Sequence, residues 1–344
     1  MSEEDEDEPR HVNGHRPAGL LQLLHPSLKS TDLPALEDLP FDVDEVSARI
    51  VRVKAETMPN ALTAQMLGNE REGSGIIIDG DGLILTIGYV ILEAAEVAVT
   101  TDTGMVSSAE VVGYDYESGF GLVKATLPLG VSPLEIGNPT TLKENDPTLI
   151  VGYGGNENIM MALIVSRRDF ACYWEYMLED AFFTSPPHPS WSGAAMVGID
   201  GTLMGLGSLF VNDTQPGSGG LPGNMFIPID LLEPILPAML SRRFGAQQPR
   251  PWLGLFTAET LGHLVVAGVM QDGPADDAGL EPGDIILRVA EQRVKTLREL
   301  YKAIWGLGDA GIIVPMTLVR DGDTKEVDVR SVNRYSFFRL PMMH

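Results

Sequence analysis

The sequence predicts a mainly β protein, because its apolar residues form short runs bounded by glycine or by Asp-Gly pairs. Between residues 74 and 210 the runs have roughly four to eight residues and recur about every ten residues, as in GSGIIIDGDGLILT at 73–86. This spacing is typical of antiparallel strands in a barrel or sandwich. The Asp-Gly pairs at 81–82 and 200–201 lie between apolar runs, where glycine permits the positive φ of a hairpin turn.

Two segments have the spacing of helices instead. Apolar residues from Leu231 to Leu240 recur at helical intervals before Arg242, Arg243 and Gly245, which indicates a helix that closes the preceding domain. A second helix is expected from Leu297 to Trp305, followed by a last strand, IIVPMTLVRDG. Between the two helices, AQQPRP at 246–251 is an expected linker, since its prolines stop helix propagation.

Composition limits the partners and the compartment. The formal net charge of −24 disfavours nucleic acid and anionic membranes, and favours basic partners or cations. The single cysteine, Cys172, excludes an intramolecular disulfide. The first residues, MSEEDEDEPR, are acidic where a secretory signal is basic, and apolar runs are too short to span a bilayer. We therefore expect a cytoplasmic protein without a membrane anchor.

Four segments, taken in order, resemble the high-temperature-requirement A (HtrA) family of trypsin-like serine proteases. They are GSGIIIDGDGLILT (73–86), VVGYDYESGFGLVK (111–124), HPSWSGAAMVGIDGTLMGL (188–206) and MFIPIDLLEPIL (225–236). The resemblance implies a chymotrypsin/trypsin-like double β-barrel followed by a PDZ domain. It divides the chain into an acidic, proline-containing arm (1–48), the double barrel (49–245), the linker (246–251), the PDZ domain (252–334) and a tail (335–344).

The resemblance also assigns the three catalytic positions, and two of them differ from the family. The position of the family's histidine holds Tyr89, and that of its orienting aspartate holds Gly119. A phenol with a pKa near ~10 is protonated at neutral pH and is a poor general base. Ser192 keeps the nucleophile's position, but a serine without an adjacent base is weakly nucleophilic.

The loop around Ser192 departs from the family as well. Ser190 replaces a glycine that shapes the oxyanion hole, whereas Gly193 is kept. We therefore predict a chain that is not an enzyme, although residual hydrolase activity stays open. One alternative is a serine hydrolase with a new base near Ser192, such as His188. Another is a metal-binding protein that uses His11 and His15 of the tail, although we expect no metal and no cofactor.

The C-terminal domain keeps the PDZ pattern. GPADDAGLEPGDIILRV at 273–289 is similar to the family's PDZ core, and PWLGLF at 251–256 occupies the place of its carboxylate-binding loop. Free backbone N–H groups in such a loop bind a terminal carboxylate, and the next strand pairs with the peptide. The expected peptide-binding residues are Trp252, Leu253, Gly254, Leu255, Leu300 and Ile304, together with Leu307; the alternative is that they only form the core.

These inferences lead to one functional prediction. The chain is expected to be a catalytically inactive pseudoprotease that acts as a protein-binding adaptor, scaffold or assembly factor. Its partner would be a protein or peptide, such as a C-terminal or basic segment, bound through the PDZ domain. Since relatives of this architecture commonly assemble as trimers, we also expect a homo-oligomer of unspecified order.

Overall fold

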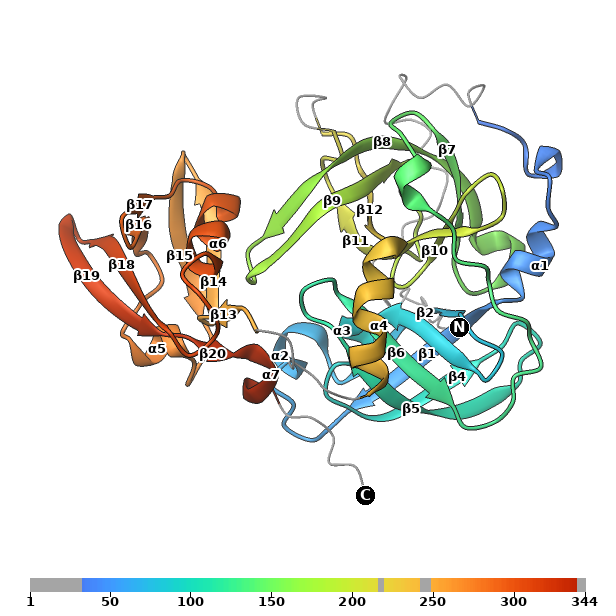
Figure 1. Cartoon of the computed structure of the whole chain (residues 1–344), viewed down its shortest axis with the longest axis horizontal. Coiled ribbons are helices and arrows are strands. Elements are labelled where there is room, and N and C mark those ends of the chain that lie inside the picture. Colours follow the sequence, from blue (N-terminus) through green and yellow to red (C-terminus); the bar gives the residue numbers. More distant parts are fainter. Residues whose placement is uncertain (1–32, 216–219, 242–248, 339–344) are drawn as a thin grey trace, which may run out of the picture.

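The computed structural model describes residues 33–215, 220–241 and 249–338. Three β units follow one another along the chain: two closed barrels, packed together, and a third sheet beyond the end of a long hairpin (Figure 1). All pairings between the named strands are antiparallel, as the short apolar runs predict. The double barrel and the PDZ-like third unit confirm the predicted fold class.

The first barrel has the strand order β1-β2-β3-β6-β5-β4. Its strands are β1 (Ile50–Thr57), β2 (Glu70–Ile77), β3 (Leu83–Ile87), β4 (Ala94–Thr100), β5 (Val106–Tyr114) and β6 (Phe120–Ala125). The predicted hairpin at 73–86 is confirmed as β2 and β3. In its turn, Asp79 accepts hydrogen bonds from the N–H groups of Asp81 and Leu83, and Gly82 has a φ of +85°. Two short helices lie in the connections of this barrel: α2 (Ala64–Leu67) between β1 and β2, and α3 (Gly88–Ile91) between β3 and β4.

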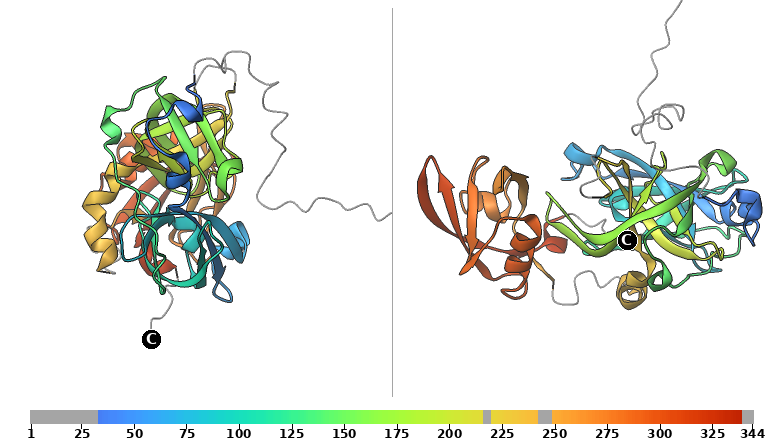
Figure 2. Two further views of the ribbon diagram at one scale, coloured as in Figure 1. Left: turned by 90° about the vertical axis from the view of Figure 1, so that its right-hand side faces the viewer. Right: turned by 90° about the horizontal axis from the view of Figure 1, so that it is seen from above.

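The second barrel has the order β10-β11-β12-β9-β8-β7. Its strands are β7 (Pro147–Val151), β8 (Ile159–Cys172), β9 (Tyr176–Ser185), β10 (Ala195–Val197), β11 (Leu203–Val211) and β12 (Gly223–Pro228). The hairpin of β8 and β9 extends well beyond the barrel toward the third unit (Figures 1 and 2). The expected closing helix is present as the 3₁₀ turn η6 (Ile229–Leu231) and α4 (Leu232–Leu240).

Within the described residues, the third unit consists of a six-stranded sheet, a separate two-stranded sheet formed by its first and last strands, and three helices. Its strands are β13 (Pro251–Trp252), β14 (Leu255–Thr260), β15 (His263–Val269), β16 (Ile285–Val289), β17 (Gln292–Arg293), β18 (Ile313–Arg320), β19 (Asp323–Arg330) and β20 (Val332–Asn333), and its helices are α5 (Pro274–Asp277), α6 (Leu297–Trp305) and α7 (Arg334–Phe337). The helix predicted from Leu297 to Trp305 is confirmed. The strand predicted as the last one is β18, but β19 pairs with it along its whole length, and β20 follows.

The remaining short elements precede the barrels or join their strands. They are η3 (Leu36–Asp38), α1 (Val43–Ser47), η4 (Pro139–Thr141) and η5 (Gly155–Asn158). Phe41 packs against Gly201 in the β10–β11 turn, so the described end of the predicted arm lies on the second barrel. Of the predicted linker, residues 246–248 lie outside the described ranges, and Pro251 already belongs to β13. The domain boundaries stay predictions.

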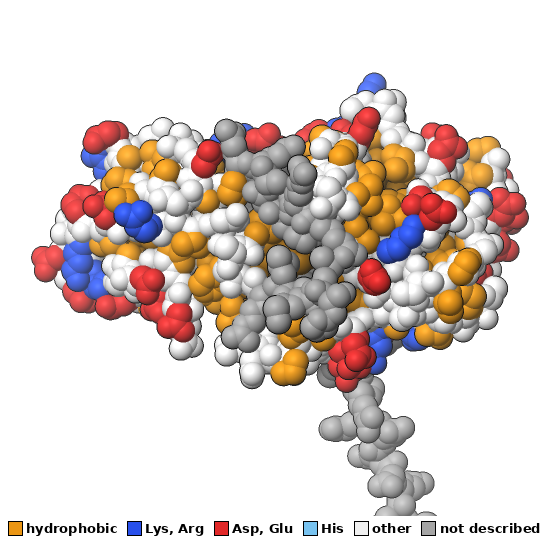
Figure 3. Space-filling model, turned by 60° about the horizontal axis from the view of Figure 1, so that its bottom comes forward, with side chains coloured by type: hydrophobic (Ala, Val, Ile, Leu, Met, Phe, Trp, Pro, Cys, Tyr) orange, Lys and Arg blue, Asp and Glu red, His pale blue; other side chains and the backbone are white. Residues whose placement is uncertain are grey.

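The apolar cores follow the division into units. Buried residues of both barrels form one large cluster, a smaller cluster lies within the second barrel, and the third unit has its own, which includes Met177 from β9. On the face drawn in Figure 3, acidic and basic side chains are interspersed at both ends of the molecule. Within the described residues, no helix has both the length and the apolar character needed to cross a bilayer.

Candidate functional site

Ser192 lies where the two barrels meet. It belongs to the loop between β9 and β10, and its carbonyl oxygen accepts a hydrogen bond from the N–H of Ser74 on β2 at 2.7 Å. The next residue, Gly193, has a φ of +72°, and a Cβ on it would lie 2.1 Å from the carbonyl oxygen of Ser74. The Ser192 hydroxyl is buried and lies beside the phenol of Tyr89.

Tyr89 adjoins this loop, as its position in the sequence implies. It is the second residue of α3, and its phenol donates a hydrogen bond to the carbonyl oxygen of Ser208 at 2.8 Å. Burial raises the pKa of Tyr89 to about 12, and the neighbouring side chains of Ser192 and Trp191 offset part of that rise. The phenol is therefore protonated at neutral pH and engaged as a donor.

Gly119 ends the turn between β5 and β6 and has a φ of +91°. Its N–H donates to the carbonyl oxygen of Asp115, and its carbonyl oxygen accepts from the N–H of Gly88 next to Tyr89. The carboxylate of Asp115 accepts hydrogen bonds from Ser118 and from the phenol of Tyr335. The carboxylate of Asp115 is thus engaged within the turn and with the C-terminal segment, and Glu117 in the same turn pairs with Arg250.

His188, the alternative base, makes no hydrogen bond to the hydroxyl of Ser192; its ring is engaged elsewhere. Its Nδ1 accepts a hydrogen bond from the N–H of Ser190, and its Nε2 donates to the carbonyl oxygen of Asn158, both at 3.1 Å. The imidazole is 1% exposed, and burial lowers its pKa to about 4. The hydroxyl of Ser190 donates to the side chain of Asn158, so Ser190 and His188 together anchor the loop to the segment before β8.

The proposed metal site cannot be placed. His11 and His15 lie outside the residues that the structure describes. Across residues 33–215, 220–241 and 249–338, no three or more His, Cys, Asp or Glu side chains are grouped so as to hold a metal ion.

The loop at the start of the third unit binds a carboxylate within the chain. The N–H of Leu255 donates to Oε1 of Glu175 at 2.7 Å, and the N–H of Leu253 donates to Oε2 at 3.0 Å. Between them Gly254 has a φ of +75°, the backbone conformation that turns successive N–H groups to one side. In this structure the loop therefore holds the side-chain carboxylate of Glu175, and its binding of a peptide carboxylate stays a prediction.

The other predicted peptide-binding residues are mostly in the core of the third unit. The side chains of Leu253, Leu255, Leu300 and Ile304 are fully buried, and Trp252 packs against Phe337 and Phe338. Leu307 lies at the surface. Their role in peptide binding stays a prediction.

Sequence reasoning missed Glu175, which is the residue that occupies the loop. It lies between β8 and β9, far along the chain from Leu253, and local patterns carry no information about such a long-range pairing. The only available signal was the segment CYWEYM at 172–177, where a glutamate and three aromatic residues interrupt two apolar runs.

The double barrel, the loop that carries Ser192 and the carboxylate-binding sheet define a trypsin-like peptidase domain joined to a PDZ domain. Comparison with known families agrees: residues 73–206 match the trypsin-like peptidase domain, and residues 251–330 match the PDZ domain. The chain is homologous to the DegP and HtrA proteases. The predicted resemblance is thereby confirmed.

Two curated relatives illustrate the similarity. The "Probable periplasmic serine endoprotease DegP-like" of Ectopseudomonas mendocina is 27% identical over 315 residues, which cover 86% of this chain and 63% of the relative. The "Probable periplasmic serine protease do/HhoA-like" of Haemophilus influenzae is 27% identical, with 75% of this chain and 57% of the relative covered. The chain therefore spans less than two thirds of these relatives' length.

Solved structures support the fold. The "HtrA-type protease AlgW with decapeptide" aligns with a TM-score of 0.51 at 22% identity, and the match covers 85% of this chain and 97% of that chain. The "HtrA-type protease AlgW with tripeptide" gives 0.50 at 22% identity, with 84% and 95% covered.

Two predictions are corrected by the relatives. The chain was expected not to be an enzyme, but its homologues are named serine endoproteases and share its trypsin-like domain, so they point to a protease. That expectation rested on the triad positions and on Ser190 in the oxyanion loop, and substitutions there do not define the class of the whole domain. A cytoplasmic location was also expected, but the relatives are named periplasmic proteins. An acidic N-terminus was an insufficient basis for assigning the compartment.

Proposed function

We propose that the protein recognises polypeptides by their free C-terminal carboxylate, through the PDZ domain. The observation that supports this proposal is the pair of N–H groups, from Leu253 and Leu255, that converge on one carboxylate. Two charge-assisted hydrogen bonds in a buried loop favour an anion over a neutral amide. The adjacent strand β14 lies at an edge of its sheet, where an extended peptide can add as another strand.

The test is a binding measurement by fluorescence anisotropy on the full chain. The probe is a fluorescein-labelled peptide that ends in Tyr-Trp-Val with a free carboxylate, and its control is the same peptide with a C-terminal carboxamide. We expect the carboxamide to bind at least about tenfold more weakly, because it cannot receive both charge-assisted bonds. Equal affinity for the two peptides, or no binding of either peptide even when Glu175 is replaced by Gln, would contradict the proposal.

In this role the protein would act as an adaptor that holds a partner polypeptide next to the trypsin-like domain. Self-association into a homo-oligomer remains part of this proposal. Since the named relatives are periplasmic, we propose the same compartment, which fractionation of the native host can test.

A second candidate function is peptide-bond hydrolysis at Ser192. It is favoured by the serine endoprotease relatives and by Ser192, which keeps the nucleophile's position in the loop where the two barrels meet. Hydrolysis would need a proton acceptor other than Tyr89, whose phenol stays protonated at neutral pH. A fluorophosphonate probe tests this function directly. Stoichiometric labelling that is lost in Ser192→Ala supports it, and absence of labelling in the unaltered chain contradicts it.

A further inference from the structure

The tip of the β8–β9 hairpin lies against the PDZ sheet and helix α6, at the place where a PDZ ligand would bind. In Figures 1 and 2 the hairpin leaves the second barrel and ends beside α6 and β14. Met177 from β9 is part of the buried core cluster of the third unit, and Ala171 from β8 packs on it. The hairpin is therefore built into this unit.

The backbone of the tip is bound on two sides. On one side, the N–H of Thr257 on β14 donates to the carbonyl oxygen of Tyr173 at 3.0 Å, which continues the edge of the sheet. On the other side, the phenol of Tyr301 on α6 donates to the carbonyl oxygen of Cys172 at 2.6 Å and accepts from the N–H of Glu175 at 3.2 Å. Edge pairing and helix contact are the two features of β-strand addition.

The carboxylate of Glu175 completes the likeness to a ligand. Its two oxygens take the N–H groups of Leu253 and Leu255, as a terminal carboxylate would. Tyr173, whose carbonyl oxygen pairs with β14, lies two residues before Glu175. In an extended peptide, residues two apart lie on the same face, so a ligand's last residue and the residue two before it can reach the loop and the strand in the same way. Glu175 is a side-chain substitute for a chain terminus.

This contact is costly to form, which argues against a fortuitous one. Glu175 is 6% exposed, and burying a carboxylate carries a large desolvation cost unless its bonds are satisfied. Burial raises the pKa of Glu175, while the N–H groups of Leu255 and Leu253 lower it. Its φ of +54° is also a conformation that a residue with a side chain adopts rarely. The loop's hydrogen bonds compensate for these costs.

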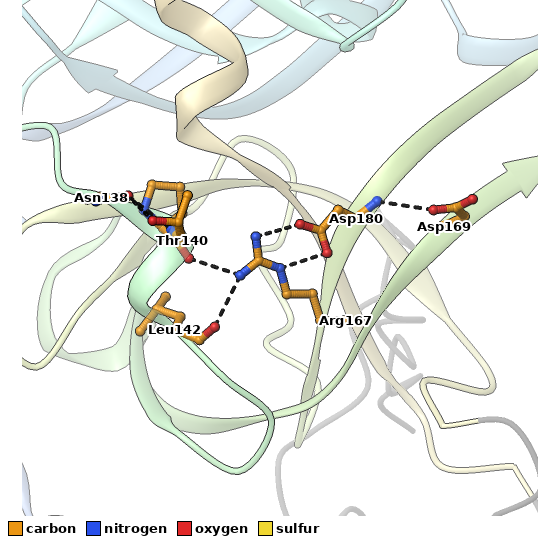
Figure 4. A network of polar contacts seen from close by, with 7 residues as sticks. Asn138, Thr140, Leu142, Arg167, Asp169 and Asp180 are labelled. Atoms are coloured by element: carbon orange, nitrogen blue, oxygen red, sulfur yellow. Dashed lines mark hydrogen bonds and ion pairs between the residues drawn. The ribbon is translucent and has the colours of Figure 1, made fainter.

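The stem of the hairpin is braced on both sides. Toward the PDZ domain, Asp169 forms an ion pair with Arg298 of α6 at 2.7 Å, and Glu179 forms one with Lys302 at 3.3 Å. Toward the barrel, Arg167 binds both carboxylate oxygens of Asp180 and the carbonyl oxygens of Pro139 and Leu142 (Figure 4). In the same view the N–H of Asp180 approaches Asp169, which joins the two networks.

We propose that residues 172–176 are a tethered ligand of the PDZ domain, and that a polypeptide with a free C-terminal carboxylate binds by displacing Glu175 from the loop of Leu253 and Leu255. This inference rests on the proposed function and adds its regulation. The apparent affinity for a peptide equals the intrinsic affinity multiplied by the fraction of molecules in which the loop is vacant. The tethered carboxylate keeps that fraction low.

The experiment compares the full chain with its Glu175→Gln variant, using the same fluorescent peptide and its carboxamide. Gln keeps the shape and removes the charge, so we expect the carboxylate peptide to bind the variant at least about tenfold more tightly. Glu96→Gln, at an exposed position on β4, is the matched control for the loss of one charge and should leave the affinity unchanged. Amide hydrogen exchange of residues 251–256 measures the hairpin contact independently, and should be faster in Glu175→Gln without peptide.

The outcomes separate this inference from the proposed function. Tighter binding and faster exchange in Glu175→Gln support both. Equal affinity of the two chains for the carboxylate peptide overturns the tethered ligand and leaves the proposed function standing. If neither chain binds the peptide, the displacement step and the proposed function both fail, whatever the exchange rates. If exchange in Glu175→Gln is also unchanged, the contact between Glu175 and the loop is refuted as well. Thermal unfolding of each variant shows whether a loss of binding reflects misfolding.

Discussion

Replacing His188 should remove a measurable part of the protein's acid sensitivity. The imidazole is buried and uncharged in the folded state: Ser190 donates to its Nδ1, and its Nε2 donates to Asn158. Burial lowers the pKa of His188 from 6.5 to about 4, so between these values the unfolded chain binds a proton that the folded chain does not. The associated stability is fully present above pH 6.5 and is lost as the pH falls toward 4. A difference of about 2.5 pKa units corresponds to about 3 kcal/mol.

Urea unfolding at several pH values between 7 and 4 measures this effect. Carboxylates make every version of the chain less stable in acid, so the informative quantity is the difference in unfolding free energy between the unaltered chain and His188→Gln. That difference should shift by about 3 kcal/mol in favour of the variant over this range. His263→Gln, at an exposed position on β15, should show no such shift. A difference for His188→Gln that does not change with pH would refute the reasoning.

Two further substitutions test the barrel interface by chemical denaturation. Gly193→Ala should destabilise the fold by about 2 to 5 kcal/mol, because its Cβ would meet the carbonyl oxygen of Ser74 in addition to the strain of a positive φ. Gly104→Ala, with a similar φ and open space around it, should cost only about 1 kcal/mol. Equal costs for the two substitutions would show that the close contact with Ser74 does not add to the loss of stability. Tyr89→Phe should cost about 1 to 2 kcal/mol, because the buried carbonyl oxygen of Ser208 loses its donor, and an unchanged stability would contradict that role.

Local patterns in the sequence predicted the elements that depend on local chemistry. The Asp-Gly turn before Leu83 and the helix that begins at Leu297 both form at the predicted residues. In the helix, Thr296 and Glu299 make a capping box, which fixes its start independently of distant residues. Turn chemistry and capping depend on residues only a few positions apart, so they can be predicted from the sequence alone.

The missed features depend on distant partners or on polar strands. β19, with the sequence DTKEVDVR, was not expected, because only Val327 and Val329 face the core and the remaining residues are polar. The pairing of Glu175 with Leu253 joins residues far apart in the chain, and neither segment requires the other locally. Site geometry of this kind arises from tertiary packing, which sequence periodicity does not encode.

The glycines around Ser192 have a structural cause that is separate from catalysis. A Cβ on Gly207 would lie 2.0 Å from the carbonyl oxygen of Trp191, and one on Gly193 would lie 2.1 Å from that of Ser74. The nucleophile's loop is therefore held by close backbone contacts with β11 and β2, and these contacts are required whether or not the hydroxyl of Ser192 reacts. A sequence motif built on these glycines consequently reports the packing of the two barrels. Whether Ser192 reacts depends instead on a group that can accept the proton of its hydroxyl, and direct labelling of the hydroxyl measures that reactivity.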